Sequence, residues 1–234
     1  MLVNMKSNFR TLILGTAIIA LGTVSACSGG TSTQATETTA PVTTSQTAQA
    51  FPASARYIAD MPMADGQTMT LGVAVDGEKV VAYACDGSDD EAWFFGSQSD
   101  GKLDITGKFR DTLKASYDGG DVVGDLTMNG VNYTFSAPQV ADPAGMYTAE
   151  LDGVRASWVV RPDDTATGVQ FSGITGRDFE QAELQQLREQ QFRDQVRNKR
   201  LLQQAAQLHL GTLRSTINGR PVVATLVTGN TKFG

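Results

Sequence analysis

The chain has 234 residues, of which 41% are hydrophobic and 19% are charged. Its 25 Asp and Glu outnumber its 19 Lys and Arg, and the resulting net charge of −6 argues against a nucleic-acid partner, because the phosphates would be repelled. One His and two Cys are too few for a metal centre built from several such ligands. We therefore expect no cofactor.

Residues 1–26 have the layout of a secretory signal peptide. Lys6 and Arg10 supply positive charge, and residues 11–24 form an apolar run shorter than the ~20 residues of a membrane-spanning helix. The segment VSAC, residues 24–27, resembles the lipobox of bacterial lipoproteins, which implies that Cys27 is lipidated and becomes the first residue after cleavage. The alternative is an ordinary signal peptide with a chance cysteine.

Residues 27–50 are expected to form the lipidated cysteine and a disordered linker. The linker is rich in Thr and Ser, and its single charged side chain is Glu37, so it cannot bury enough apolar surface to fold. Two acyl chains hold a protein stably on a membrane, whereas one binds reversibly. The sequence thus predicts a lipid-anchored protein on the extracytoplasmic face of the cell membrane.

Residues 51–177 are predicted to form an antiparallel β domain. Asx-Gly pairs, which favour tight hairpin turns, recur at 65–66, 76–77, 86–87, 100–101, 118–119, 129–130 and 152–153. They separate about ten short strands, and so many consecutive hairpins leave open edges unless the sheet closes. We predict a mainly β fold, an up-and-down barrel, with a curled open meander as the alternative.

The register of two hairpins follows from these turns. A two-residue loop at 129–130 pairs Met128 with Val131, and a loop at 152–153 pairs Tyr147 with Trp158. Both registers place apolar residues on one face and polar residues on the other, as a half-buried antiparallel pair requires. The agreement of two independent hairpins favours an antiparallel meander.

The segment AYACDGSDDEAWFFG, residues 82–96, contains two possible sites. An acidic run could attract calcium, although it lacks the spacing of an EF-hand loop; it comprises Asp86, Asp89, Asp90 and Glu91. Cys85 adjoins these acids, which disfavour a reactive thiol because such a thiol needs a nearby cation. We interpret the run as a turn between two core strands, with Trp93 and Phe95 resuming the core.

The strand before this turn has two apolar faces. If 76–77 is a two-residue loop, Val81, Tyr83 and Cys85 share the face that points away from the core. An apolar face of this kind requires a cover. We expect the helix predicted below to supply it.

Residues 178–211 are predicted to form one long Gln- and Arg-rich helix, because 178–210 contains no Gly or Pro and Gly211 can end the helix. Its apolar residues form two weak seams instead of one stripe. We interpret one seam as a partner surface, formed by Phe192, Val196 and Leu210. Residues 212–234 should form a terminal hairpin and tail, which Pro221 restricts to an edge or a separate sheet.

Residues 56–175 resemble domains of exported proteins and lipoproteins of mycobacteria and related actinobacteria. The resemblance rests on the segments AYACDG, EAW, LDITG, DPAGMY and SWVV. It implies a protein of the cell envelope and carries over no catalytic residue.

The sequence contains no recognisable catalytic arrangement. His209 is the single histidine, and no G-x-S-x-G, H-E-x-x-H or P-loop pattern occurs. We therefore expect a non-catalytic binding or scaffold protein that meets an envelope protein or polymer. The alternatives are a barrel that carries a small apolar ligand or lipid, and an enzyme that uses paired carboxylates.

Overall fold

The computed structural model describes residues 49–174 and 188–233. The predicted signal peptide, Cys27, nearly all of the linker and the first part of the predicted helix lie outside the described residues. Within the described part of the chain, no helix is long and apolar enough to cross a membrane.

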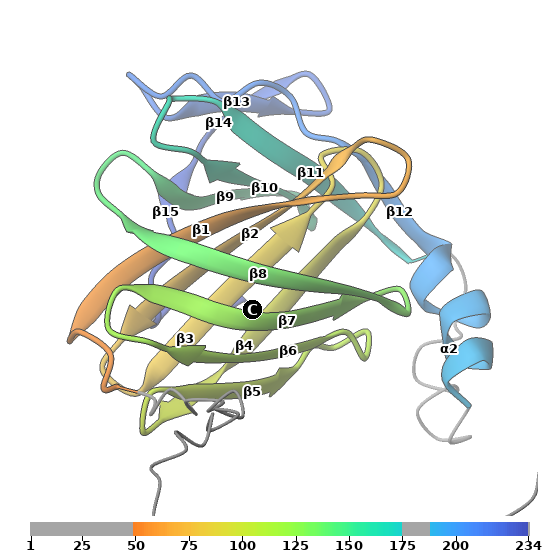
Figure 1. The fold of residues 1–234 in the computed structure, drawn as a ribbon. Helices are drawn as coiled ribbons and strands as arrows, with labels where there is room; N and C mark the ends of the chain where they lie inside the picture. The colour runs from red at the N-terminus through yellow and green to blue at the C-terminus, as the bar shows by residue number, and fades with distance from the viewer. Residues whose placement is uncertain (1–48, 175–187, 234) are drawn as a thin grey trace, which may run out of the picture. The chain divides into compact units, whose positions relative to one another are not determined.

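Eight antiparallel strands close into a barrel, in which each strand pairs with the next and the last pairs with the first (Figure 1). The pairs Arg56–Val140 and Tyr57–Gln139 join β1 to β8. The predicted up-and-down barrel is confirmed over these eight strands. They are β1 (Ser54–Pro62), β2 (Thr68–Asp76), β3 (Lys79–Cys85), β4 (Glu91–Ser99), β5 (Lys102–Thr106), β6 (Thr112–Tyr117), β7 (Asp121–Met128) and β8 (Val131–Val140).

Side chains fill the barrel because successive residues of a strand point to opposite faces. On β3, Val80, Ala82 and Ala84 belong to the interior cluster, whereas the residues between them point outward. The interior is apolar and contains several large side chains, among them Tyr57, Leu71, Phe94, Leu113, Tyr117, Leu126 and Phe135.

Both predicted hairpin registers are confirmed. Met128 pairs with Val131 between β7 and β8, and Tyr147 pairs with Trp158 between β9 and β10. The β2–β3 loop differs from the prediction, because Asp76 pairs with Lys79 and the register is displaced by two residues. An even displacement keeps every side chain on its predicted face.

The chain leaves the barrel after β8 and begins a second sheet, with the strand order β12-β11-β10-β9-β15. The prediction of about ten strands in one meander is therefore only partly correct. Once β1 and β8 pair, the barrel has no open edge on which β9 could continue. The strands of the second sheet are β9 (Gly145–Leu151), β10 (Val154–Val160), β11 (Ala166–Ile174), β12 (Arg200–Gln204) and β15 (Thr225–Leu226).

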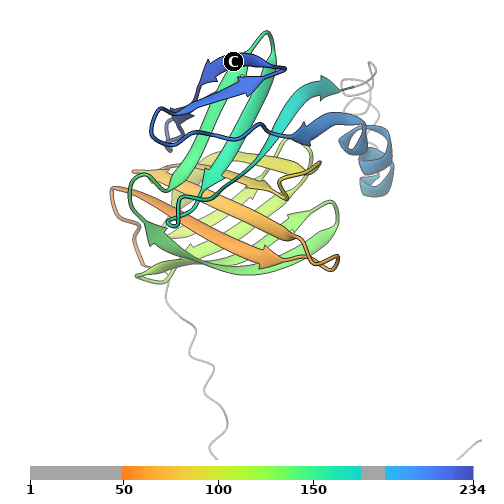
Figure 2. The ribbon, with the colours of Figure 1, turned by 90° about the horizontal axis from the view of Figure 1, so that it is seen from above.

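The second sheet packs on the outer wall of the barrel (Figure 2). Tyr83 and Cys85 are buried there with Met146 and Val159 of the second sheet. Gly72 permits this close packing, because a Cβ at that position would lie 2.5 Å from the Met146 Cγ. The outward face of β3 is thus covered as predicted, but a sheet covers it and the expected helix does not.

The other face of the second sheet is also buried. Tyr147 and Trp158 pack there against Leu208, Ile217 and Ala224. The terminal hairpin of β13 (Arg214–Ile217) and β14 (Arg220–Val223) forms a separate two-stranded sheet, as Pro221 predicts.

The prediction of one long helix is wrong over its described part. This part contains α2 (Glu189–Gln195), a 3-10 turn (Arg197–Lys199) and then β12, in which Leu202 pairs with Phe171 of β11. Helix propensities differ by at most ~0.7 kcal/mol for ordinary residues. Backbone pairing along the edge of β11, together with the buried ion pairs of Arg197 and Arg200 described below, outweighs that preference.

Candidate functional site

A pocket of about 430 Å³ lies where the second sheet meets the barrel wall. Strand β4 contributes Glu91, Trp93 and Phe95, β10 contributes Arg155, and the segment after β15 contributes Phe233. We call this cavity the Trp93 pocket. The β5–β6 loop, residues 107–111, and Arg200 of β12 also line it.

Aromatic rings form one wall of the Trp93 pocket. The rings of Trp93 and Phe95 are stacked, with centroids 5.8 Å apart and an interplanar angle of 13°. They share a face of β4 because Phe94, between them, points into the barrel. Trp93 rejoins the core as predicted, whereas Phe95 remains 42% exposed, so that part of the prediction is wrong.

Arg155 crosses this wall and connects the rings to Glu91. Its guanidinium carbon lies 4.4 Å from the Phe233 centroid and 5.6 Å from the Trp93 centroid, which is the geometry of cation–π contacts. One of its terminal nitrogens donates to Glu91 Oε1 at 3.2 Å. The guanidinium therefore neutralises the carboxylate beside the aromatic wall.

Three polar atoms of the pocket residues are buried without a hydrogen-bond partner: Glu91 Oε2, Trp93 Nε1 and Arg155 Nε. Glu91 is 3% exposed, and burial raises the pKa of its carboxyl in spite of the opposing charge of Arg155. The Tyr83 hydroxyl is buried beside Glu91 and Cys85 and interacts with both, although neither contact has normal hydrogen-bond geometry. An unpaired buried polar group costs ~1–3 kcal/mol, so the layer around Glu91 is costly to bury.

Buried ion pairs fix the side of the pocket nearest α2. Arg197 donates to Asp111 at 2.9 Å and to Asp90 at 2.8 Å, and Arg200 donates to Asp90 at 2.9 Å. Arg200 also donates to the Glu91 carbonyl oxygen. Burial raises the pKa of the Asp111 carboxyl, while Arg197 opposes the rise.

The acidic run weighed as a calcium site forms the turn between β3 and β4, as our interpretation predicts. Asp86 Oδ1 accepts backbone N–H groups of Ser88, Asp89 and Asp90, which shapes the turn. Asp90 then pairs with two arginines, and Glu91 pairs with Arg155. Within residues 49–174 and 188–233, no group of three or more His, Cys, Asp or Glu side chains is placed to hold a metal ion.

Cys85 lies beneath the second sheet and is fully buried. Its Sγ is 3.9 Å from the carbonyl oxygen of Thr167 on β11. Burial raises the pKa of the thiol to about 12, and the negative charge of Glu91 adds to the rise. The geometry agrees with an inert thiol.

The residues predicted to form a partner surface are not an exposed seam. Phe192 and Val196 are buried against Phe109, and Arg110 lies 4.0 Å from the Phe192 centroid. Leu210 is half-buried and packs with the cluster beneath the terminal hairpin. The prediction fails because these residues do not lie on one continuous helix.

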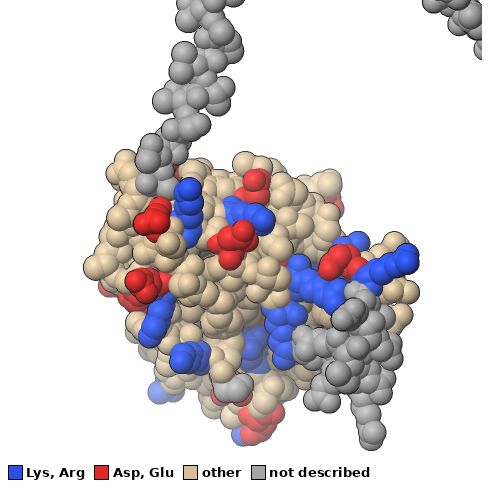
Figure 3. Space-filling view, turned by 90° about the horizontal axis from the view of Figure 1, so that it is seen from below, with Lys and Arg blue, Asp and Glu red and all other residues tan. Residues whose placement is uncertain are grey.

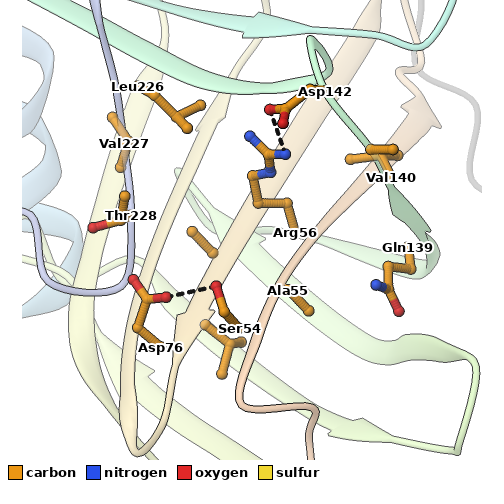
Figure 4. Close-up of a pocket in the computed structure, with 13 residues that line it drawn as sticks. Ser54, Ala55, Arg56, Asp76, Gln139, Val140, Asp142, Leu226, Val227 and Thr228 are labelled. Carbon is orange, nitrogen blue, oxygen red and sulfur yellow. Dashed lines mark hydrogen bonds and ion pairs between the residues drawn. The ribbon is translucent and has the colours of Figure 1, made fainter.

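A second cavity of about 420 Å³ lies on another side of the molecule, beside the barrel seam. Figure 4 shows Arg56 reaching Asp142, at 2.7 Å, and Ser54 donating to Asp76, also at 2.7 Å. Arg56 Nη1 is buried without a partner, as Arg155 Nε is, and each of the two guanidinium groups also binds a carboxylate. This groove offers one orphan donor and no aromatic wall, and we consider it the weaker site.

Sequence reasoning missed the roles of Arg155, Arg200 and Phe233. The β9–β10 alternation does place Arg155 on the face opposite Tyr147 and Trp158, but that polar face would ordinarily meet solvent. In the structure it meets the barrel wall instead. The sequence analysis does single out Glu91 and Trp93, which also line the pocket. It interprets Glu91 as a calcium-ligand candidate and Trp93 as a core residue.

Comparison of the chain with protein-family models, curated proteins and solved structures gives no match. The assignment of the site therefore depends on its geometry.

Proposed function

We propose that this chain is a lipid-anchored, extracytoplasmic binding protein without catalytic activity, and that it holds a small molecule in the Trp93 pocket. The observation that carries the proposal is the cavity of about 430 Å³ lined by the stacked rings of Trp93 and Phe95 and by the Glu91–Arg155 ion pair. Ligand sites are typically cavities of ~300–1,000 Å³, and the volume of the Trp93 pocket lies within this range. Its lining combines aromatic with charged side chains, the latter being Glu91, Lys108, Asp111, Arg155 and Arg200.

The molecular surface gives less support for the binding of a macromolecule. On the face shown in Figure 3, Lys and Arg side chains are interspersed with Asp and Glu over a largely uncharged surface. The predicted apolar seam for an envelope protein or polymer is buried, at least at Phe192 and Val196. A pocket ligand is therefore favoured over a docked macromolecule.

The barrel itself is a second candidate, because a closed β-barrel is compatible with carrying a small apolar ligand. Such a ligand would have to displace interior side chains, including Tyr57 and Phe94, which are fully buried. At the Trp93 pocket the ring that a ligand could displace, Phe233, is only half-buried, and we therefore favour the pocket.

The pocket can be tested by filling it. Thr106 lines the cavity from the exposed end of β5, so Thr106→Trp should block it without disturbing the core. Asp104→Trp, two residues earlier on the same exposed face, is the matched control. We expect native mass spectrometry of protein purified from its membrane fraction to show a bound small molecule in the wild type and the control, and none in Thr106→Trp. Equal occupancy of all three proteins would contradict the proposal.

The anchor can be tested separately. Cys27→Ala should release the protein from membranes, because the acyl chains that hold it would not be attached. Sedimentation after a salt wash measures the release. If the variant still sediments with membranes, lipidation of Cys27 is not what holds the protein there.

A further inference from the structure

We propose that the ligand of the Trp93 pocket is an uncharged aromatic ring that carries a hydroxyl group, and that Phe233 is an internal competitor for the place of this ring. The inference rests on the proposed function, because it names the ligand class of the same pocket. Three sets of contacts lead to it.

The first set shows that the pocket already receives a flat ring. The Phe233 centroid lies 4.6 Å from that of Trp93 at an interplanar angle of 83°, and 5.2 Å from that of Phe95 at 78°. The guanidinium carbon of Arg155 lies 4.4 Å from the same Phe233 centroid. Perpendicular ring pairs and a cation over a ring face are the favoured ways of recognising an aromatic group.

The second set concerns the unpaired polar atoms. Trp93 Nε1 and Arg155 Nε are donors without an acceptor, and both residues lie against the Phe233 ring. Glu91 Oε2 is an acceptor beside the Tyr83 hydroxyl. We infer that these buried atoms become accessible to a ligand when Phe233 moves away. A hydroxyl group both donates and accepts, so one substituent can serve both kinds of atom. A carboxylate ligand would instead compete with Glu91 for Arg155, whereas an uncharged hydroxyl leaves their ion pair intact.

The third set shows how Phe233 is held. Residues 228–231 form a turn closed by local hydrogen bonds, and Asn230 attaches the turn to Asp76 and Lys79 of the β2–β3 hairpin. Phe233 itself is only half-buried. Gly229 permits the contact, because a Cβ there would lie 2.5 Å from the Asp76 backbone nitrogen. Because β15 ends at Leu226, displacing residues 228–233 would break these contacts but no strand pairing.

One substitution outside the cavity should free the pocket, and a second serves as its control. Gly229→Ala pushes the turn off the β2–β3 hairpin, whereas Gly211→Ala meets open space and is the matched control. A closed, competing state lowers the apparent affinity by the fraction of open molecules. We expect Gly229→Ala to bind p-cresol about three- to tenfold more tightly than the wild type or Gly211→Ala.

Nuclear magnetic resonance gives a site-specific measurement. The chain has two tryptophans, so its indole N–H signals distinguish Trp93 from Trp158, whose N–H is bonded to the Ala206 carbonyl. Trp158→Phe assigns the signals. We expect p-cresol to shift the Trp93 signal and leave that of Trp158 in place. Toluene, which lacks the hydroxyl, and p-toluate, which is an anion, should bind at least about fivefold more weakly.

A third variant converts the competitor into a ligand mimic. Phe233→Tyr places a phenol on the same segment, so we expect a higher melting temperature than for the wild type and no shift of the Trp93 signal by p-cresol. Phe233→Leu, which removes the ring, should instead lower the melting temperature and permit binding.

The outcomes separate the two proposals. If toluene and p-cresol bind equally, or if Gly229→Ala and Phe233→Leu bind no better than the wild type, the inference of a hydroxylated ring in competition with Phe233 is wrong. The proposed function survives that result if Thr106→Trp still removes a bound molecule of other chemistry. If, in addition, Thr106→Trp retains the same bound molecule as the wild type, both proposals are wrong.

Discussion

The barrel interior and the layer between the barrel and the second sheet are both buried, but their chemistry differs. The interior is an apolar cluster, in which the hydroxyl of Tyr57 is the buried polar atom that lacks a partner among the described side chains. The layer outside holds Cys85 and the Glu91–Arg155 pair, and four of its polar atoms lack a normal hydrogen bond: Tyr83 Oη, Glu91 Oε2, Trp93 Nε1 and Arg155 Nε. The contrast indicates that the interior supports the fold, whereas the proposed binding site lies in the layer.

The largest effect should appear in thiol reactivity. Burial raises the pKa of Cys85 from 9.0 to about 12, so its thiolate fraction at neutral pH falls roughly a thousandfold. In a Cys27→Ser background, where Cys85 is the remaining cysteine, we expect a water-soluble maleimide to react very slowly with the folded protein and rapidly in denaturant. Similar rates in both states would mean that the layer between the sheets is open.

Two adjacent residues of β4, Phe94 and Phe95, allow the barrel interior and the outer layer to be compared directly. Phe94 is fully buried in the barrel, and Phe94→Ala should lower the free energy of unfolding by ~3–5 kcal/mol. Phe95 is 42% exposed on the pocket wall, and Phe95→Ala should cost about 1 kcal/mol or less. Urea denaturation measures both values. Equal losses would contradict the division between supporting and binding regions.

The pH dependence of stability provides a smaller test. Burial raises the folded-state pKa of Glu91 above its ordinary value of 4.5, so the folded protein retains a proton that the unfolded chain has released. The free energy of unfolding should therefore fall as the pH rises from about 4.5 through the folded-state pKa. Glu91→Gln should lose this part of the dependence, whereas the exposed Glu150→Gln should retain it. Urea denaturation from pH 4 to 8 compares the three proteins.

Local patterns were sufficient to predict much of the barrel. Alternation around the Asx-Gly turns fixes which side chains of β2, β3, β7 and β8 share a face, and the many hairpins favour closure. The register between β2 and β3 differs from the prediction by two residues, as the pairing of Asp76 with Lys79 shows. The predicted faces are still correct, because an even shift leaves every side chain on the same face.

Long-range stacking could not be predicted in the same way. Residues 200–204 have helical composition, yet they pair with β11, and nothing local in the sequence specifies that edge. Arg155 occupies the polar face of its hairpin, and the sequence cannot show that this face meets another sheet. The Trp93 pocket was missed for this reason, because its residues come together only when two sheets stack.

The barrel seam also bears on the order in which the chain folds. Most strand pairs join neighbours along the sequence, but the contact of Arg56 with Asp142 at the seam spans 86 residues. The entropic cost of closing a loop rises with its length, so short hairpins can form before this closure. We expect the β1–β8 pairing to be absent from early intermediates and to form as the last ladder of the barrel. Pulsed hydrogen exchange during refolding would then protect the amides of β7 before those that join β1 to β8.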